Sequence, residues 1–177
     1  MNLQVGVVVP TLGTRADFLA DCLKSIRLAG EAYVVVVGPK EALLQLGLDP
    51  NLYDQVVSDQ GRGLPSAINL GVASLPKSCT YATWLGDDDL LTPKALEIAK
   101  EVLEKKPDVV AVYGACDYID ENGDTFWTNK FGRLAVPLLS FGPNKIPQPG
   151  SLFRRTAFEL IGGLDTSLGW AFDQDMF

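Results

Sequence analysis

The sequence predicts an α/β protein with a mostly parallel central sheet and helices on both of its faces. Two observations support this fold class: short, near-continuous apolar runs, and stretches of helical periodicity that alternate with them. A strand that is apolar at successive positions has both of its faces buried, and parallel strands need a covering segment between them. The length of 177 residues fits one domain.

The expected strands are short runs rich in valine or other apolar residues. The first spans Leu3 to Val9 and ends at a Pro-Thr pair, and the second contains four successive valines. The later ones are weaker or shorter but keep the same apolar character. The expected strands after the first are Tyr33 to Val37, Asp54 to Ser58, Thr80 to Leu85 and Val109 to Tyr113.

Between these strands, apolar residues recur three and four positions apart, which is the spacing of one helix face. We expect the first helix to start at Thr14, with Asp17 completing an approximate capping box, and to end at Gly30. We expect a later helix to have Thr92 as its N-cap and Pro93 at its first position. The helices between them are marked by Glu41 to Leu46 and by Leu64, Ile68 and Val72.

The pattern changes after residue 115. An alternating stretch contains Asn122-Gly123, a strong signal for a β-hairpin turn, and residues 141–150 read as a loop rich in proline and glycine. Residues 151–165 predict a strand, a short helix and a Gly-Gly stop. The last residues, AFDQDMF, read as the start of a helix, so we expect residues 1–177 to be one domain truncated at its C-terminus.

Composition excludes several kinds of chemistry. The chain has no histidine, which rules out a Ser-His-Asp triad, a histidine base and a histidine-ligated metal within it. Acid–base chemistry therefore falls mainly to carboxylates. The net charge of -7 and the lack of a basic run argue against a nucleic-acid partner.

Cysteines and hydropathy indicate a cytoplasmic protein without a membrane span. Cys22, Cys79 and Cys116 are odd in number and widely spaced, so we expect reduced thiols rather than disulfides or a zinc site. The apolar N-terminus is too short to cross a membrane and lacks a charged leader and a cleavage site.

The main chemical feature is Asp87-Asp88-Asp89, directly after a buried strand. Adjacent carboxylates repel one another, and a hard divalent cation such as Mg²⁺ or Mn²⁺ relieves that repulsion. In an extended stretch Asp88 points away from the other two, so not all three need be ligands. The alternative is a solvated acidic loop that favours the dipole of the next helix.

Two loops have the composition of nucleotide-binding segments. PTLGTR follows the first strand, where a glycine before a helix N-terminus can receive an anion, and GRGLPSAINLG places Arg62 between two glycines. An ordinary turn and a flexible surface loop are the alternatives. Asn69, in the middle of a predicted helix, fits a backbone-bonding role better than a ligand role.

A second acidic pair lies near the C-terminus. Asp173 and Asp175 are two positions apart, so one can face a cleft as a general base while the other is solvated. Two acids in the first turn of a helix are the alternative. We expect tryptophans in the core, although Trp170, in a glycine-flanked loop, has the apolar face needed to stack on a sugar ring.

Taken together and in order, these segments resemble glycosyltransferase family 2, inverting enzymes with the GT-A nucleotide-diphospho-sugar transferase fold. The resemblance covers nearly the whole chain. It is carried by VVVPTLGTRADFLADCLKSI, GRGLPSAINLGVA, YATWLGDDDLLTPKALE, which is similar to the metal-binding DxD segment, IPQPGSLFRRTAFELIGGLD and AFDQDMF.

The resemblance implies a role for individual residues. Asp88 and Asp89 would bind Mn²⁺ or Mg²⁺, and Asp173, with Asp175 as the second candidate, would take the proton of the acceptor hydroxyl. The acceptor would lie against Gln148 and Trp170. The residues expected at the nucleotide are Pro10, Thr11, Arg15, Arg62 and Asp87.

The implied reaction is a single displacement with inversion, in which a sugar moves from a nucleotide-diphosphate donor of the UDP, dTDP or GDP type to an acceptor hydroxyl. The acceptor would be a saccharide or a lipid-linked sugar, with the enzyme in the cytoplasm at the inner membrane face and polysaccharide biosynthesis as its context. A non-catalytic nucleotide-sugar-binding module and a sugar-phosphate nucleotidyltransferase are the alternatives.

Overall fold

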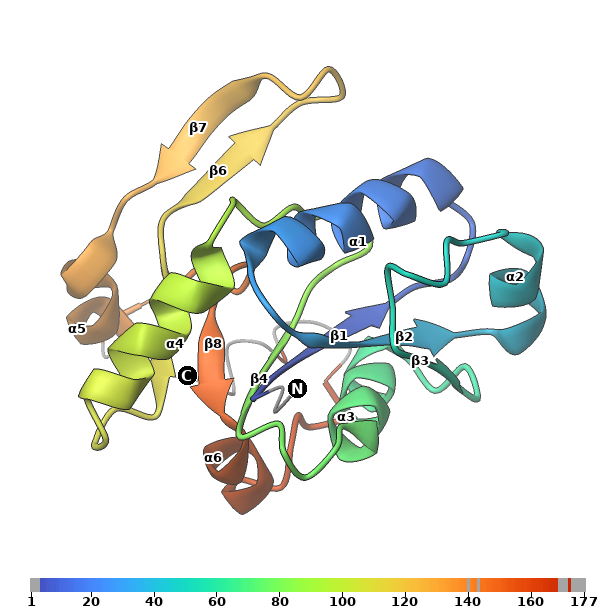
Figure 1. Cartoon of the computed structure of the whole chain (residues 1–177). Coiled ribbons are helices and arrows are strands. Elements are labelled where there is room, and N and C mark those ends of the chain that lie inside the picture. Colours follow the sequence, from blue (N-terminus) through green and yellow to red (C-terminus); the bar gives the residue numbers. More distant parts are fainter. Residues whose placement is uncertain (1–3, 140, 143, 169–171, 173–177) are drawn as a thin grey trace.

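A computed structural model describes residues 4–139, 141–142, 144–168 and 172. It confirms an α/β architecture, with a six-stranded sheet in the order β3-β2-β1-β4-β8-β5 (Figure 1). The helices lie on both faces of this sheet. The strands of the sheet are β1 (Val5–Pro10), β2 (Tyr33–Gly38), β3 (Gln55–Ser58), β4 (Tyr81–Trp84), β5 (Ala111–Val112) and β8 (Leu152–Arg154).

The covering segments are short and mostly fall where helical periodicity predicts them. The helices are α1 (Ala16–Ala29), α2 (Lys40–Gln45), α3 (Leu64–Ser74), α4 (Ala95–Lys105), α5 (Ala135–Leu139) and α6 (Arg155–Leu160), with a 3₁₀ turn η1 (Gly132–Leu134). The segment of η1 and α5 is the one part of this set that the sequence analysis does not predict.

The order in which the strands are added to the sheet reverses at β1. β1 pairs in parallel with both β2 and β4, and β2 pairs in parallel with β3, whereas β8 is antiparallel to β4 and β5. The chain therefore leaves β1 toward one edge of the sheet and later returns to its other side. In open α/β sheets, ligands bind beyond the carboxyl ends of the strands at such a reversal. The crevice beyond β1 and β4 is the expected site.

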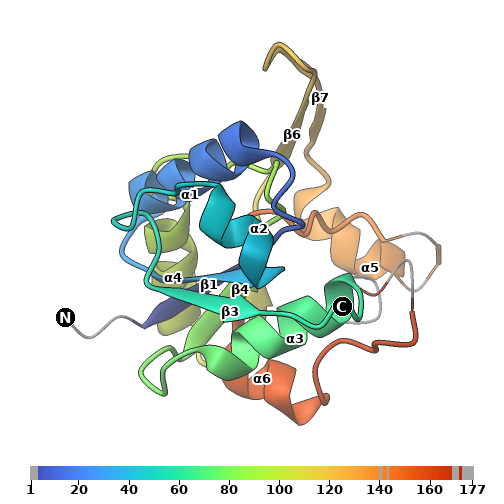
Figure 2. The same cartoon turned by 90° about the vertical axis from the view of Figure 1, so that its right-hand side faces the viewer.

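Helices cover both faces of the sheet (Figure 2), and the core has two layers, one on each face. Successive valines of β1 point to opposite layers: Val7 packs with residues of α1 and α4, and Val8 packs with residues of α3. Both side chains are fully buried. Burial of one such valine contributes about 1.5–3 kcal/mol. These layers hold the carboxyl ends of β1 and β4 in fixed positions.

Two helix starts differ from the sequence prediction. Thr14 does not cap α1, which begins at Ala16 and has no side-chain cap bond. α4 begins at Ala95 rather than at Pro93, because Lys94 before it has a left-handed φ of 65°. The backbone N–H of Lys94 donates to the carbonyl of Leu28 at the end of α1, at 3.1 Å. This bond between helices overrides the local capping pattern.

The predicted hairpin is present as β6 (Cys116–Ile119) and β7 (Thr125–Asn129), which extend away from the main sheet (Figure 1). Its turn is held by the Asp120 carboxyl, which accepts backbone bonds from Asn122 and Asp124, at 2.9 and 3.0 Å. Trp127 lies on this hairpin and is 47% exposed, and its ring is tilted against that of Tyr118, with 4.9 Å between the ring centroids. The expectation that Trp127 is a core residue is therefore wrong, whereas Trp84 is buried as expected.

The structure also bears on the cysteines and on the length of the helices. No disulfide joins the three cysteines in the part of the chain that the structure describes; Cys22 and Cys79 are buried and Cys116 is partly exposed. None of the helices that the structure describes has the length and apolar character needed to cross a lipid bilayer.

Candidate functional site

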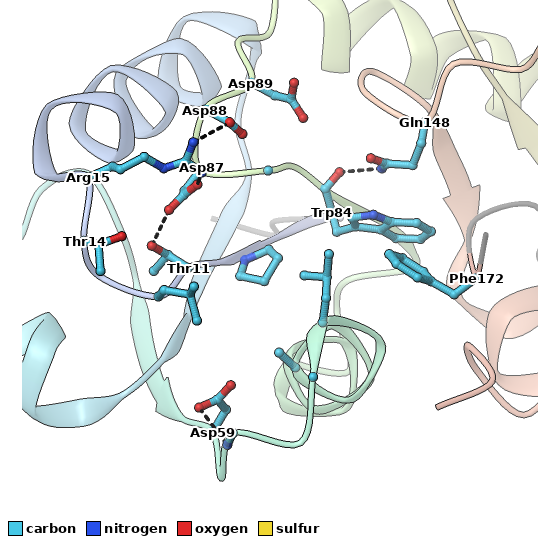
Figure 3. Close-up of a pocket in the computed structure, with 17 residues that line it drawn as sticks. Thr11, Thr14, Arg15, Asp59, Trp84, Asp87, Asp88, Asp89, Gln148 and Phe172 are labelled. Atoms are coloured by element: carbon cyan, nitrogen blue, oxygen red, sulfur yellow. Dashed lines mark hydrogen bonds and ion pairs between the residues drawn. The ribbon is translucent and has the colours of Figure 1, made fainter. Parts of the chain in front are cut away.

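A cavity of about 810 Å³ opens beyond the carboxyl ends of β1 and β4 (Figure 3). The segments after β1, β3 and β4 supply most of its wall. Among the described residues it gathers four carboxylates and one guanidinium: Asp59, Asp87, Asp88, Asp89 and Arg15. Such an acidic cavity can hold an anionic ligand only with the help of a cation.

The end of β1 is joined to the end of β4 through Thr11 and Asp87. The Thr11 hydroxyl donates to Oδ2 of Asp87 at 2.5 Å, and the backbone N–H of Gly13 donates to the same hydroxyl at 3.0 Å. Both side chains are buried. The preceding residue, Pro10, also lines the cavity. Three residues expected at the nucleotide therefore lie together on one wall.

Arg15, from the turn before α1, binds two of the three successive carboxylates. Its guanidinium donates to Oδ1 of Asp87 and, at 2.6 Å, to Oδ2 of Asp88. The hydrogen bond to Asp88 is the main reason that the pKa of Arg15 is raised. The side chain of Asp87 is 7% exposed, whereas those of Asp88 and Arg15 are 49% and 45% exposed. One of the two pairs is thus shielded and the other faces water.

Asp88 and Asp89 converge on Gly86. Oδ1 of Asp88 and Oδ2 of Asp89 lie 3.1 and 2.8 Å from the point where a Cβ on Gly86 would stand. A backbone bond from Asp89 N–H to the Gly86 carbonyl, 3.1 Å long, closes the turn that brings them together. Burial, with a smaller effect of the Asp88 charge, raises the pKa of the Asp89 carboxyl to about 6.

Asp88 and Asp89 fit a small divalent cation whose remaining coordination positions would be filled by the substrate and water. Within the described part of the chain, no three His, Cys, Asp or Glu side chains are grouped to hold a metal by themselves. Mg²⁺ is commonly bound by one or two carboxylates, with phosphate and water oxygens filling its other positions. Two oxygens around the empty side of Gly86 match that requirement.

The opposite end of the cavity is formed by Asp59 and the glycine-rich loop after it (Figure 3). The backbone N–H of Asp59 donates to the carbonyl of Gly38 at 3.2 Å, and its Oδ1 accepts from Gly61 N–H at 3.3 Å. Asp59 is not among the predicted site residues, although it directly follows a predicted strand, which is where ligand-binding residues are expected. Arg62 is exposed, bonds to Gln60, and does not line the cavity.

Gln148 lines the cavity beside Trp84, and its side-chain amide donates to the backbone carbonyl of Trp84 at 2.8 Å. A second, larger cavity of about 1400 Å³ shares Asp88, Asp89 and Gln148 with the first. Phe172 lines the first cavity. The predicted residues Trp170, Asp173 and Asp175 lie outside the described residues.

Asn69 has a structural role. Its side-chain amide donates to the Leu164 carbonyl at 2.8 Å and accepts from the Leu164 N–H at 2.9 Å. It thereby ties α3 to the segment after α6, as the backbone-bonding interpretation predicts.

The strand order and its reversal at β1 place this site where α/β proteins with an open sheet bind their ligands. No protein-family model and no curated protein matches the chain. Solved structures do.

Two crystal structures of S. aureus TarS, a glycosyltransferase with the GT-A fold, are similar to this chain. TarS 1–349 has a TM-score of 0.69 and 16% identity, over 97% of this chain and 53% of that one. A longer TarS chain has a TM-score of 0.68 and 15% identity, with 32% of that chain covered. The chain thus spans about half of TarS 1–349 and about a third of the longer chain.

Two further neighbours match at a TM-score of 0.54. Rv0371c of Mycobacterium tuberculosis H37Rv, in complex with manganese, is 16% identical over 90% of this chain and 75% of its own. The 4-diphosphocytidyl-2C-methyl-D-erythritol synthase of Anaerococcus prevotii is 13% identical over 98% and 85%, respectively. At these identities the likeness establishes the fold alone, and it confirms the GT-A type of fold that the family resemblance implies.

Proposed function

We propose that this protein transfers a sugar from a nucleoside-diphosphate sugar to an acceptor hydroxyl, with inversion and with the help of Mn²⁺ or Mg²⁺. The observation that carries the proposal is the convergence of Asp88 and Asp89 on Gly86, in the cavity at the sheet's reversal. A cation held there lies where a diphosphate can reach it, with room in the cavity for the attached nucleoside and sugar.

The donor would lie along the cavity from Asp88 and Asp89 to Asp59. Pro10 and Thr11 would contact the nucleoside, and Asp87, which Thr11 and Arg15 hold in place, would face the ribose. Arg15 would bind the diphosphate, and Arg62 at the exposed loop would assist it. The bound cation would neutralise charge on the departing diphosphate.

In the proposed step, the acceptor oxygen forms a bond to the anomeric carbon while the bond from that carbon to the diphosphate oxygen breaks. Asp173 would take the hydroxyl proton, with Asp175 as the second candidate. Phe172 supports this choice because it lines the cavity and precedes Asp173 in the chain. Gln148 and Trp170 would contact the acceptor, a saccharide or a lipid-linked sugar. A cytoplasmic location at the inner membrane face stays a prediction.

Calorimetry with UDP, dTDP and GDP, each with and without Mn²⁺, tests the proposed donor site. We expect one nucleotide to bind only with metal and to lose at least about tenfold in affinity in Asp88→Asn, which removes a ligand charge. Asp49→Asn is the control for the same change of charge, because Asp49 is also exposed but lies outside the cavity. Absence of metal-dependent binding to any nucleotide would refute the donor site.

A turnover assay separates the proposal from its alternatives. A glycosyltransferase releases nucleoside diphosphate from its donor sugar and slows greatly in Asp173→Asn. A nucleotidyltransferase, the reaction class favoured by the A. prevotii synthase as a neighbour, would instead consume nucleoside triphosphate and sugar phosphate. A binding module would bind nucleotide without turnover and would be indifferent to Asp173→Asn.

A further inference from the structure

Arg15 is the one positively charged side chain among the described residues that line the candidate donor cavity. Four carboxylates line the same cavity, and Arg15 bridges two of them, Asp87 and Asp88. In the protein without ligands, the positive charge beside the carboxylates is therefore supplied by the chain itself.

The two carboxylates that the guanidinium contacts differ in their exposure to water. Asp87 is buried and also accepts the Thr11 hydroxyl, so its pairing is part of the wall of the cavity. Asp88 is half exposed, and the described residues give it no other hydrogen-bond partner than Arg15. Exposed ion pairs contribute little to stability, which makes the contact with Asp88 the one that is readily broken.

The same contact conflicts with the binding of a cation. Arg15 occupies Oδ2 of Asp88, while Oδ1 of Asp88 points toward Gly86 and Asp89. A divalent cation held by Asp88 and Asp89 would lie next to the guanidinium of Arg15. The two positive charges would repel each other. A diphosphate removes the conflict, because it offers the guanidinium a bidentate partner of opposite charge.

The position of Arg15 allows this exchange without movement of the backbone. Its guanidinium lies 5.8 Å from the ring centroid of Phe18, one turn further along the chain, and its side chain is 45% exposed. The Phe18 ring can hold the guanidinium in place while one of its nitrogens exchanges Asp88 for the diphosphate.

We infer that Arg15 takes the place of the divalent cation at Asp88 in the free protein and passes to the donor's diphosphate when metal and donor bind together. This inference rests on the proposed function. Its consequence is that metal and nucleotide strengthen each other's binding, since each removes Arg15 from Asp88, and that this coupling is reciprocal.

Mn²⁺ binding in the absence of nucleotide, measured by electron paramagnetic resonance of the free ion, tests the inference. We expect weak binding to the wild type and about 5- to 10-fold tighter binding to Arg15→Gln, which frees Asp88 and removes the repelling charge. With Mn²⁺ present, UDP should bind Arg15→Gln about tenfold more weakly than wild type, because the diphosphate loses its guanidinium. The two changes have opposite signs.

Two further variants separate the exchange from a general effect of charge. Lys40→Gln removes one positive charge at the first position of α2, just beyond β2, and should leave Mn²⁺ binding within about twofold of wild type. Arg15→Lys keeps the charge but lacks the planar fork that bridges two carboxylates, so its metal affinity should lie between those of wild type and Arg15→Gln.

Unchanged or weaker Mn²⁺ binding by Arg15→Gln would overturn the inference, even if metal-dependent nucleotide binding stands. An equal gain in Lys40→Gln would also overturn it. If the wild type binds no nucleotide with metal, the proposed function fails, while the metal-only measurement still decides whether Arg15 competes for Asp88. A fall of both affinities in Arg15→Gln would assign Arg15 a structural role instead.

Discussion

Because residue 86 is a glycine, the acidic residues after β4 can lie close to its backbone. A Cβ at this position would stand 2.8 Å from Oδ2 of Asp89 and 3.1 Å from Oδ1 of Asp88, closer than ordinary contacts allow. Because both neighbours are the ends of flexible side chains, they can move aside at little cost. A methyl group here would therefore disturb the carboxylates far more than the fold.

We expect Gly86→Ala to weaken metal-dependent nucleotide binding by about tenfold, on the scale of one lost charge-assisted ligand contact. Unfolding in urea should change by less than about 1 kcal/mol, because only the flexible ends of Asp88 and Asp89 have to move. Gly114→Ala is the control, because a Cβ there meets nothing within 4 Å. Wild-type nucleotide affinity in Gly86→Ala would mean that the two carboxylates do not act through the space beside Gly86.

The pKa of Asp89 makes stability depend on pH in the metal-free protein. Burial and the Asp88 charge raise this pKa from 3.8 to about 6, so the folded state holds the proton more tightly than the unfolded chain. The contribution to folding is full below the unfolded value and is lost as pH rises through 6. Relative to Asp89→Asn, the wild type should lose about 2–3 kcal/mol between pH 4 and pH 7. Urea unfolding with a chelator measures this; a difference that is flat with pH would contradict it.

At the scale of elements, the approach of α3 to the sheet depends on Gly71. A Cβ at this position would lie 2.3 Å from Cγ1 of Val8 and 3.0 Å from Cγ2 of Val37, both in the buried core. Neither valine has free space to move into, since both are fully buried. The glycine therefore lets α3 carry its loop to the cavity without a gap between helix and sheet.

Gly71→Ala should destabilise the protein by about 1–3 kcal/mol, the usual cost of overpacking a core. The alanine's better helix propensity, under about 1 kcal/mol, offsets only part of this. Chemical denaturation against Gly114→Ala as the reference measures the effect. A Gly71→Ala protein as stable as wild type would show that α3 is less closely packed on β1 and β2 than the distances indicate.

The sequence predicts most elements correctly because their signals are local. Apolar runs and helical periodicity reflect burial on a sheet or a helix face, and these survive in the structure. The start of α4 could not be predicted, since it is set by a bond between Lys94 and Leu28, far apart in sequence. Trp127 was misplaced because the turn signal that predicts the hairpin does not show whether the hairpin packs on the core or extends from the domain.

For the whole molecule, the site is predictable only in pieces. Asp87, Asp88 and Asp89 are neighbours in sequence, so their shared chemistry is visible without a structure. The bridge from Arg15 to two of them depends on β1 and β4 lying side by side, which sequence periodicity does not reveal. Asp59 likewise becomes a cavity residue only because β3 lies next to β2.

The place of β8 in the sheet has a consequence for synthesis on the ribosome. β8 is late in the chain, yet it lies between β4 and β5 and pairs with both. The edges of β4 and β5 that receive it stay open until Leu152–Arg154 has emerged. Chains are made from the N-terminus at about 5–20 residues per second, so these edges wait for seconds. During that interval the growing chain presents strand edges to which a neighbouring polypeptide can pair.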